Sequence, residues 1–185
     1  MLIEASIIYT SGIDYIFKVI LTGPGAVGKT SLVNRYITNT FVKNYKITIG
    51  VDFMSKTLKI NQNKIAKMTI WDIGGQERFK FLRQSFYEGS HGALLVFDLT
   101  RAVTFHEMKS WLLELQQSAG IKTPFVLIGN KADLIKDIGE CVDSNEVRMF
   151  AEQYNSIYIE TSAKSGDNVE NAFLQLAYLM MNRQR

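Results

Sequence analysis

The segment Gly23–Ser31, GPGAVGKTS, combines glycines, a lysine and a threonine at a spacing that suits the binding of a phosphate chain. It fits the pattern G-x-x-x-x-G-K-[ST], in which backbone N–H groups point at the phosphates and glycines allow a close approach. Lys29 supplies positive charge for the outer phosphates, and Thr30 supplies a hydroxyl ligand for Mg²⁺. An ordinary glycine turn before a helix is the alternative. The predicted contacts are Gly23, Gly25, Ala26, Val27, Gly28, Lys29, Thr30 and Ser31.

The tetrapeptide NKAD, residues 130–133, indicates which base accompanies the phosphates. A carboxylate accepts two hydrogen bonds from the N1–H and the exocyclic amine of guanine, whereas adenine offers one amine and an acceptor. Asp133 therefore favours guanine over adenine, and the stem of Lys131 can lie along the base. A polar turn with a helix-capping aspartate is the alternative. The predicted contacts here are Asn130, Lys131 and Asp133.

Two further segments provide candidate base contacts. ETSAK, residues 160–164, follows an apolar run, and its small residues Ser162 and Ala163 can offer backbone N–H groups to the guanine carbonyl, with Lys164 beside them. A strand-to-helix turn is the alternative reading of this segment. Phe41 can stack on the base, and packing in the core is its alternative.

The stretch WDIGGQERF, residues 71–79, contains a carboxylate, glycine N–H groups and a carboxamide that could contact a third phosphate and its metal ion. Asp72 can hold Mg²⁺ through water, the N–H of Gly75 can reach a γ-phosphate, and Gln76 can orient an attacking water. Thr48, in a segment without helical periodicity, can bind Mg²⁺ and sense the same phosphate, and plain β-propensity is its alternative. A glycine-rich turn alone would not require an aspartate and a glutamine at these places. We therefore predict Gln76 and Lys29 as catalytic residues and Thr30, Thr48 and Asp72 as metal ligands.

The elements that position these residues follow from the apolar pattern. Continuous apolar strands separated by helical segments predict a parallel sheet covered on both faces. The turn at Asn61–Asn63 predicts a hairpin, which would place one antiparallel strand at an edge. Ligands of such sheets bind at the carboxyl ends of the strands, where the motifs lie. The predicted strands are 15–23, 55–60, 64–72, 92–100, 124–130 and 156–162.

Helix boundaries can be predicted from capping patterns. Thr104 with Glu107 three residues later resembles a capping box, which predicts a helix that begins at Thr104. Asp143 with Glu146 predicts a helix that runs to about Tyr154. The last helix is predicted from about Asn168, with one apolar face at helical spacing. That face comprises Val169, Ala172, Phe173, Leu176, Ala177 and Met180.

Length and composition favour one domain and exclude several functions. A chain of 185 residues suits a single domain. The net charge of +3 is scattered, which argues against nucleic acid binding. The single cysteine, Cys141, fits a reducing compartment and predicts a cytoplasmic protein. No apolar run reaches the roughly 20 residues of a membrane span. The ending NRQR has no prenylation box, so attachment to membranes is left open.

The motifs together resemble the small GTPases of the Ras superfamily, and the Rab family most of all. The stretches that carry this resemblance are YKITIGVDF, IWDIGGQERF, FYEGSHGALLVFDLT, GNKADL and ETSAK. The resemblance implies an α/β P-loop NTPase fold (G domain) over residues 14–182, preceded by an extension, residues 1–13. It implies six strands, five of them parallel, ringed by five helices. It also implies binding of GTP, GDP and Mg²⁺ and slow hydrolysis to GDP and phosphate.

The resemblance further implies a monomeric molecular switch in membrane trafficking, with loops near Thr48 and Gln76 that change with the nucleotide. Phe53, Trp71 and Phe86 would form an aromatic triad for exchange factors, GTPase-activating proteins and effectors, and burial in the core is their alternative. A scaffold of the same fold that holds nucleotide without turnover is the rival function. A P-loop kinase is disfavoured by NKAD and by the missing arginine-rich lid.

Three features depart from the Rab pattern. Ile73-Gly74 replaces the usual threonine-alanine and, with Gly75, resembles Arf proteins. Pro24 is unusual in the phosphate loop. The cysteine tail of Rab proteins is missing from the C-terminal residues. The Ile73-Gly74 pair leaves open how stiff the loop near Gln76 is and how it responds to exchange factors. The predicted contact of this loop with phosphate is not affected.

Overall fold

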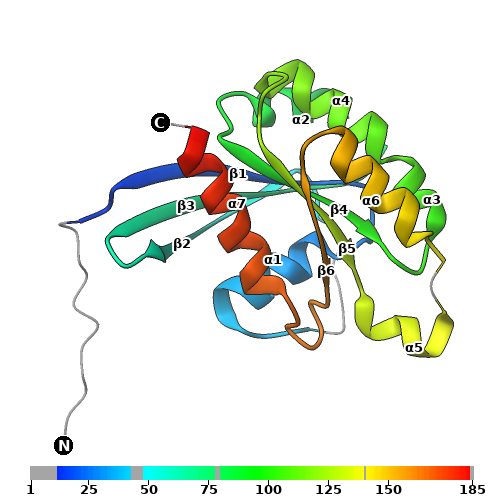
Figure 1. Cartoon of the computed structure of the whole chain (residues 1–185). Helices are drawn as coiled ribbons and strands as arrows, with labels where there is room; N and C mark the ends of the chain where they lie inside the picture. Colours follow the sequence, from blue (N-terminus) through cyan, green and yellow to red (C-terminus); the bar gives the residue numbers. More distant parts are fainter. Residues whose placement is uncertain (1–11, 43–47, 78–79, 140, 184–185) are drawn as a thin grey trace, which may run out of the picture.

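A single six-stranded sheet runs through the computed structural model, which describes residues 12–42, 48–77, 80–139 and 141–183 (Figure 1). The strand order is β2-β3-β1-β4-β5-β6, with β2 antiparallel to β3 at one edge and the other five strands parallel. This confirms the predicted fold class and sheet, whereas the described residues form seven α-helices and not the five that the resemblance implied. The strands are β1 (Tyr15–Thr22), β2 (Val51–Asn61), β3 (Lys64–Ile73), β4 (Gly92–Asp98), β5 (Phe125–Asn130) and β6 (Ile157–Thr161).

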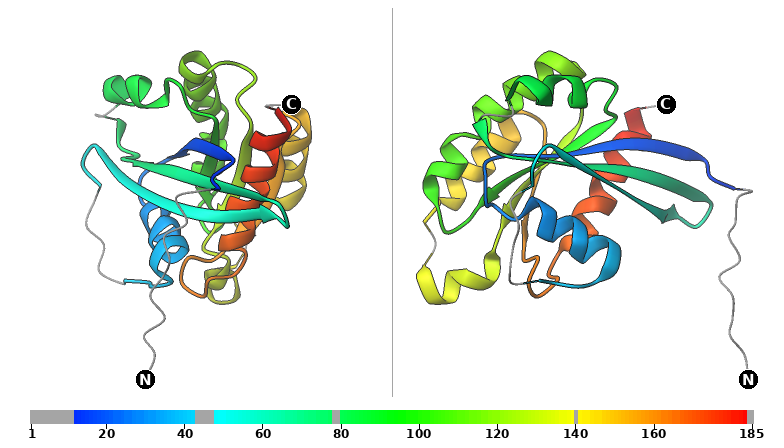
Figure 2. Two further views of the ribbon diagram at one scale, coloured as in Figure 1. Left: turned by 90° about the vertical axis from the view of Figure 1, so that its left-hand side faces the viewer. Right: turned by 180° about the vertical axis from the view of Figure 1, so that it is seen from behind.

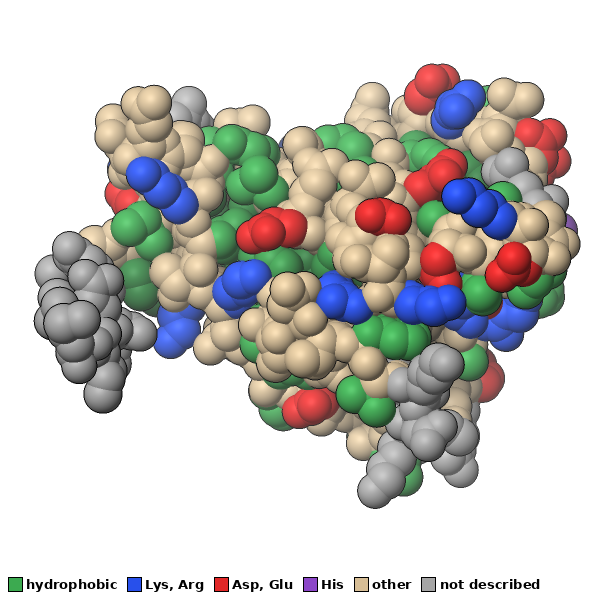
Figure 3. Space-filling view, turned by 90° about the horizontal axis from the view of Figure 1, so that it is seen from below, with side chains coloured by type: hydrophobic (Ala, Val, Ile, Leu, Met, Phe, Trp, Pro, Cys, Tyr) green, Lys and Arg blue, Asp and Glu red, His purple; other side chains and the backbone are tan. Residues whose placement is uncertain are grey.

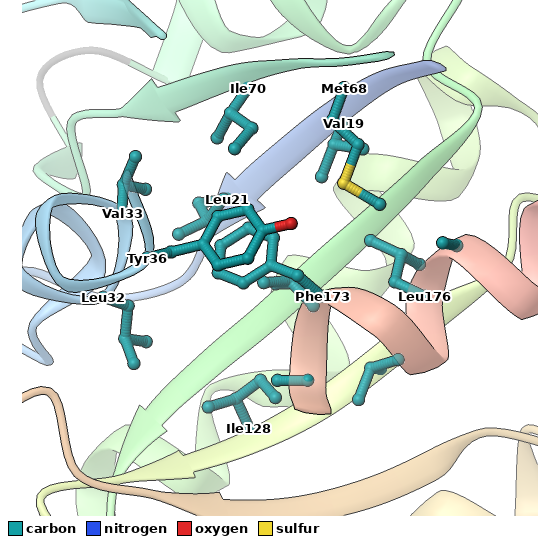
Figure 4. Close-up of a cluster of buried hydrophobic side chains, with 14 of the residues drawn as sticks. Val19, Leu21, Leu32, Val33, Tyr36, Met68, Ile70, Ile128, Phe173 and Leu176 are labelled. Carbon is teal, nitrogen blue, oxygen red and sulfur yellow. The ribbon is translucent and has the colours of Figure 1, made fainter. Parts of the chain in front are cut away.

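Helices cover both faces of the sheet (Figures 1 and 2). On one face lie α1 (Lys29–Thr38) and α7 (Val169–Arg183), and Figure 4 shows Tyr36 of α1 stacked on Phe173 of α7, with ring centroids 3.8 Å apart. The opposite face is covered by α2 (Lys80–Tyr87), α3 (Ala102–His106), α4 (Met108–Ala119) and α6 (Ser144–Gln153). Beyond the end of β5 lie the short η2 (Ala132–Leu134) and α5 (Ile135–Ile138).

The burial of the strands explains their sequences. Every residue of β4, GALLVFD, and of β5, FVLIGN, is buried, because helices pack on both sides of these central strands. The edge strand β2 instead alternates and keeps many side chains exposed. Because the parallel strands all end at one side of the sheet, the motifs that follow them meet there.

Several predicted boundaries hold in the structure. The hairpin turn lies between Asn61 and Lys64 as predicted, although β2 begins earlier, at Val51. Asp143 caps α6, and its carboxylate accepts a hydrogen bond from the N–H of Asn145 at 2.8 Å. All six residues of the predicted apolar face of α7 are buried.

The predicted capping box at Thr104 is wrong. Thr104 lies inside α3, which begins at Ala102, and a second helix, α4, begins at Met108. The buried hydroxyl of Thr104 accepts a hydrogen bond from the N–H of Asp98 at 3.0 Å and lies 2.7 Å from the carbonyl oxygen of Arg101. The end of β4 therefore uses the hydroxyl that the local pattern assigned to a helix cap.

The N-terminal extension lies largely outside the described residues. Of the predicted extension 1–13, only Gly12 and Ile13 are described, so its role stays a prediction. Residues 45–47 and 78–79 of the family-like stretches also lie outside. Asp14, at the predicted domain boundary, joins the sheet through its N–H, which donates to the carbonyl of Ile65 at 2.9 Å. None of the helices in the described residues is long and apolar enough to cross a membrane.

Candidate nucleotide-binding site

A cavity of about 590 Å³ lies at the carboxyl ends of the parallel strands. In Figure 3 the molecule is seen from the side where α5 and the loop before α7 lie in Figure 1, and Lys and Arg side chains form a broken row across that face. Most predicted site residues line this cavity: Gly25, Ala26, Gly28, Lys29, Thr30, Ser31, Phe41, Thr48, Gly75, Gln76, Asn130, Lys131, Asp133, Ala163 and Lys164. Four predicted residues do not line it: Gly23, Val27, Asp72 and Ser162.

The phosphate loop depends on backbone conformations that side chains disfavour. Gly28 has φ of 96°, and Gly23 has φ of 136° with no space for a Cβ beside the carbonyl oxygen of Val96. Ala26 adopts φ of 62°, a left-handed conformation that is strained by roughly 1 kcal/mol in a residue with a Cβ. The loop therefore keeps a fixed curvature with its N–H groups available for an anion.

Lys29 is the buried cation of this loop. Its Nζ donates to the carbonyl oxygens of Gly23 and Pro24 at 2.7 and 2.8 Å. Burial lowers the pKa of Lys29 to about 8, and the nearby carboxylate of Asp72 opposes that shift. An ammonium with this pKa is still mostly protonated at neutral pH, and phosphate oxygens would stabilise its charge.

Asn130, at the end of β5, connects two other segments that line the cavity, the phosphate loop and the segment after β6. It is buried, and its amide nitrogen donates to the carbonyl oxygen of Val27 at 2.8 Å. Its amide oxygen accepts from the hydroxyl of Thr161 at 3.1 Å and from the N–H of Ala163 at 3.3 Å. Asn130 and Val27 thus brace the site from behind.

The predicted base-selecting residues lie close together. One carboxylate oxygen of Asp133 accepts a hydrogen bond from the hydroxyl of Ser162 at 2.6 Å, and Nζ of Lys164 lies 3.6 Å from the other. Lys131, at φ of 70°, extends along the cavity and places its Nζ 2.7 Å from the carboxylate of Asp98. Ser162 does not line the cavity, and its N–H, predicted to contact the base, donates instead to the carbonyl of Asp167 at 3.1 Å. Its hydroxyl acts on the cavity through Asp133.

The three predicted metal ligands converge. The hydroxyls of Thr30 and Thr48 lie 2.9 Å apart. Asp72 is fully buried, and its carboxylate oxygens have no hydrogen-bond partner among the described residues. Burial raises the pKa of Asp72 to about 6, although the Thr30 hydroxyl and the charge of Lys29 act in the opposite direction. The described residues contain no group of three or more His, Cys, Asp or Glu that could hold a metal. The three predicted ligands offer two hydroxyls and a carboxylate, and such oxygen ligands suit Mg²⁺.

Comparison with known proteins identifies the family. The Ras family model matches residues 18–182. The chain belongs to the Ras family. It is 44% identical over 163 residues to the Ras-related protein RABA1h of Arabidopsis thaliana, covering 88% of this chain and 73% of the relative. It is 42% identical over 172 residues to human Rab-30, covering 93% and 83%, and 40% identical over 169 residues to Rab-1A of Dictyostelium discoideum, covering 91% and 82%.

These matches show a Rab-like small GTPase of the Ras superfamily. The predicted family is thereby confirmed. As a member, the chain is a GTP-hydrolysing enzyme whose ligands are GTP, GDP and Mg²⁺. The enzyme class and its ligands agree with a cavity that brings together most of the residues predicted to bind phosphate, base and metal.

The three predicted aromatic residues lie next to one another, Phe53 on β2, Trp71 on β3 and Phe86 on α2. The ring centroids of Phe53 and Trp71 lie 4.5 Å apart, and those of Trp71 and Phe86 lie 6.1 Å apart. Phe53 is 53% exposed, so burial in the core does not account for it. Trp71 and Phe86 are partly buried against the cluster beneath α2 and α4.

Sequence reasoning missed several residues of this GTPase site. Ile73 and Leu134 line the cavity. Asp98 accepts hydrogen bonds from Nε of Arg101 at 2.8 Å and pairs with Lys131, while Nη2 of Arg101 donates to the carbonyl of Gly25 at 3.2 Å. Burial alone would raise the pKa of Asp98, but these cations and Thr100 outweigh it and lower the pKa. The signal was available, since Asp98 ends a buried strand at the same edge as the other motifs.

Proposed function

We propose that this chain is a molecular switch that hydrolyses GTP slowly with Mg²⁺ and signals to partners through the loops around Thr48 and Gln76. The proposal is carried by the position of the two hydroxyls of Thr30 and Thr48, 2.9 Å apart near the unpartnered carboxylate of Asp72. Thr30 belongs to α1, whereas Thr48 belongs to the segment that leads to β2. A ligand that engages both hydroxyls would therefore couple that segment to the phosphate loop.

The metal-binding role is assigned to Thr30, Thr48 and Asp72. Bound Mg²⁺ would neutralise charge on the phosphate oxygens. Thr30 would hold the ion in both nucleotide states, and Thr48 only when the γ-phosphate is present. Asp72 would accept hydrogen bonds from water on the ion, which would satisfy a buried carboxylate that has no hydrogen-bond partner within the described part of the chain.

The catalytic roles are assigned to Gln76 and Lys29. Gln76 lines the cavity, and its carboxamide can orient a water towards the γ-phosphate. Lys29 stabilises charge on the outer phosphates. A Cβ on Gly75 would lie 2.5 Å from Nζ of Lys29, so the backbone of this loop approaches the phosphate loop closely. That approach supports a contact between the N–H of Gly75 and the last phosphate.

The base would be held by residues from three segments. Asp133 would accept two hydrogen bonds from guanine, and Ser162 orients its carboxylate. The stem of Lys131 and the ring of Phe41 line the cavity where the flat base would lie. Ala163 and Lys164 line the same part of the cavity. The N–H of Ala163, which was predicted to contact the guanine carbonyl, donates to the amide oxygen of Asn130 at 3.3 Å in this structure.

Partners would meet the chain at the aromatic triad and the two switch loops. The exposed ring of Phe53 packs edge-on against Trp71, and Phe86 lies on the neighbouring helix α2. The Rab names of the relatives support a role in membrane trafficking, with exchange factors, GTPase-activating proteins and effectors as partners. We assign this role to a cytoplasmic monomer whose G domain spans residues 14–182.

The proposal is tested by single-turnover hydrolysis of GTP by the unmodified chain and by Gln76→Leu. The substitution keeps the side-chain volume and removes the groups that hold the water. We expect hydrolysis to slow by roughly tenfold or more, with little change in GTP affinity, because the phosphate loop and Mg²⁺ supply binding. Equal rates in the two proteins would replace the switch by a scaffold that only holds nucleotide.

A further inference from the structure

Arg83 of α2 is a buried cation that the site described above does not use. Its side chain is 1% exposed, and its Nε and Nη2 donate to the two carboxylate oxygens of Glu114 in α4 at 2.6 and 2.9 Å. The guanidinium also lies over the ring of Trp111, 4.2 Å from its centroid. These contacts come from α4, which packs beside α2 (Figure 1). The orientation of the guanidinium plane is therefore set by α4.

The remaining nitrogen of the same guanidinium reaches the catalytic loop. Nη1 of Arg83 donates to the backbone carbonyl of Gln76 at 2.9 Å. Because the guanidinium is planar, the paired bonds to Glu114 fix the direction of this third bond. The exposed carboxylate of Glu77 lies 3.6 Å from Nη2 and adds a weaker contact to the same loop. Arg83 therefore connects a rigid helix to the residue proposed to orient water.

Helix packing alone does not explain this arrangement. A buried ion pair contributes little net stability, because removing both charges from water offsets their attraction. Apolar side chains of similar volume would join α2 to α4 equally well. Only a side chain with several donors in a fixed geometry can bind Glu114 and the carbonyl of Gln76 together.

We propose that Arg83 is a positioning residue for GTP hydrolysis, which fixes the backbone of Gln76 and is itself held by Glu114. This inference rests on the proposed function, since it requires Gln76 to orient the water. Arg83 touches neither phosphate nor water in this scheme. It narrows the positions available to the Gln76 carboxamide, and an error of about 1 Å in such positions slows catalysis up to about 10²-fold.

The experiment compares single-turnover GTP hydrolysis in Arg83→Lys, Gln76→Leu and the double variant. Lysine keeps the charge but cannot make the paired bonds and also reach Gln76. We expect Arg83→Lys to slow hydrolysis about fivefold or more, with GDP affinity changed less than about twofold. In the Gln76→Leu background the same substitution should have no further effect, because both residues act on one step.

Two further variants separate positioning from folding. Glu114→Gln keeps the size of the side chain and removes its charge, and it should also slow hydrolysis. It replaces Arg83→Lys as the test if that variant does not fold. Lys80→Gln removes an exposed charge from the same helix, one that pairs with Glu77 at 3.2 Å, and should leave the rate unchanged. GDP affinity and thermal unfolding are measured for every variant.

Each outcome bears on the inference. If Arg83→Lys slowed hydrolysis equally in the unmodified chain and in the Gln76→Leu background, the inference would be wrong. Arg83 would then be a structural residue. If Gln76→Leu slowed hydrolysis but Arg83→Lys and Glu114→Gln did not, the role of Arg83 would be wrong and the proposed function would stand. No effect of Gln76→Leu would remove both the inference and the water-orienting role in the proposed function.

Discussion

The predicted site has a base half, which comprises Asn130, Asp133 and Ser162, and a metal half, which comprises Thr30, Thr48 and Asp72. The two halves differ in how their polar groups are satisfied. In the base half, Asn130 bonds to the phosphate loop and to the segment after β6, and Ser162 holds Asp133. In the metal half, Asp72 has no hydrogen-bond partner among the described residues, and a single hydroxyl contact joins Thr30 to Thr48. The base half is complete through the protein's own contacts, whereas the metal half has a buried charge that a ligand would satisfy.

This difference suggests a division of labour. A preformed region binds ligand with little loss of conformational freedom, so the base half should supply most of the affinity. A region whose polar groups are satisfied only by ligand responds to whether that ligand is present. Substitutions in the base half should therefore affect GTP and GDP alike, and substitutions in the metal half should separate them.

The largest expected effect belongs to Asp133→Asn, which breaks the base half. Asparagine offers one donor and one acceptor where guanine presents two donors, so GTP and GDP affinities should both fall by roughly 10³-fold or more. Xanthosine triphosphate, whose edge is complementary to asparagine, should bind the variant better than GTP does. The measurement is competition against a fluorescent GDP analogue. If the unmodified protein bound ATP as tightly as GTP, guanine selection by Asp133 would be wrong.

A smaller effect is expected for Asn130→Ala, which removes the connection between the loops. The carbonyl of Val27, the hydroxyl of Thr161 and the N–H of Ala163 would all lose a partner. The free energy of unfolding should fall by about 2–3 kcal/mol, because buried polar groups without partners are costly. It is measured by denaturant titration with GDP in excess.

Asn171→Ala is the matched control for that titration. Asn171 is exposed on α7 and bonds only weakly, to Gln175 at 3.3 Å, so its removal should change the free energy of unfolding by less than about 0.5 kcal/mol. A similar loss of free energy of unfolding in both variants would show that the hydrogen bonds of Asn130 do not stabilise the site.

The smallest effect, a loss of affinity of about tenfold or less, is expected for Thr48→Ala. It tests the comparison because it should distinguish GTP from GDP. This substitution should weaken a non-hydrolysable GTP analogue by about 1 kcal/mol and leave GDP unchanged, because its hydroxyl is needed only beside the γ-phosphate. Thr30→Ala should weaken both nucleotides. Titrations at fixed Mg²⁺ measure the four affinities. Equal weakening of both nucleotides by Thr48→Ala would remove the loop's role as a switch.

Local sequence patterns predicted most of the cavity but not its supports. The phosphate loop and the NKAD segment were found because each motif is contiguous and follows an apolar run. The brace from Asn130 to Val27 spans 103 positions and exists only because the β5 end lies beside the phosphate loop. Arg83 and Glu114 lie 31 positions apart on helices whose packing no local pattern specifies.

The error at Thr104 has the same origin. Its local pattern matched a capping box, but the hydroxyl lies at the end of β4 and bonds to Asp98 there. A buried N–H at a strand end needs a partner as much as a helix end does. Sequence spacing cannot tell whether the hydroxyl will bond to the strand end or to the helix start, because it does not show which of these N–H groups is buried.

The sequence by itself determined the ligand chemistry, since the donors, acceptors and charges that recognise phosphate and guanine are contained in short segments. It also determined the order of the strands, through apolar runs that match each of them, but not the division of the segment after β4 into α3 and α4. Only the tertiary structure decided that Asp72 is buried with no partner in the ranges that the structure describes, that Asn130 joins two loops and that Arg83 reaches Gln76. Burial and long-range hydrogen bonds depend on which elements become neighbours, and that is a property of the packed chain.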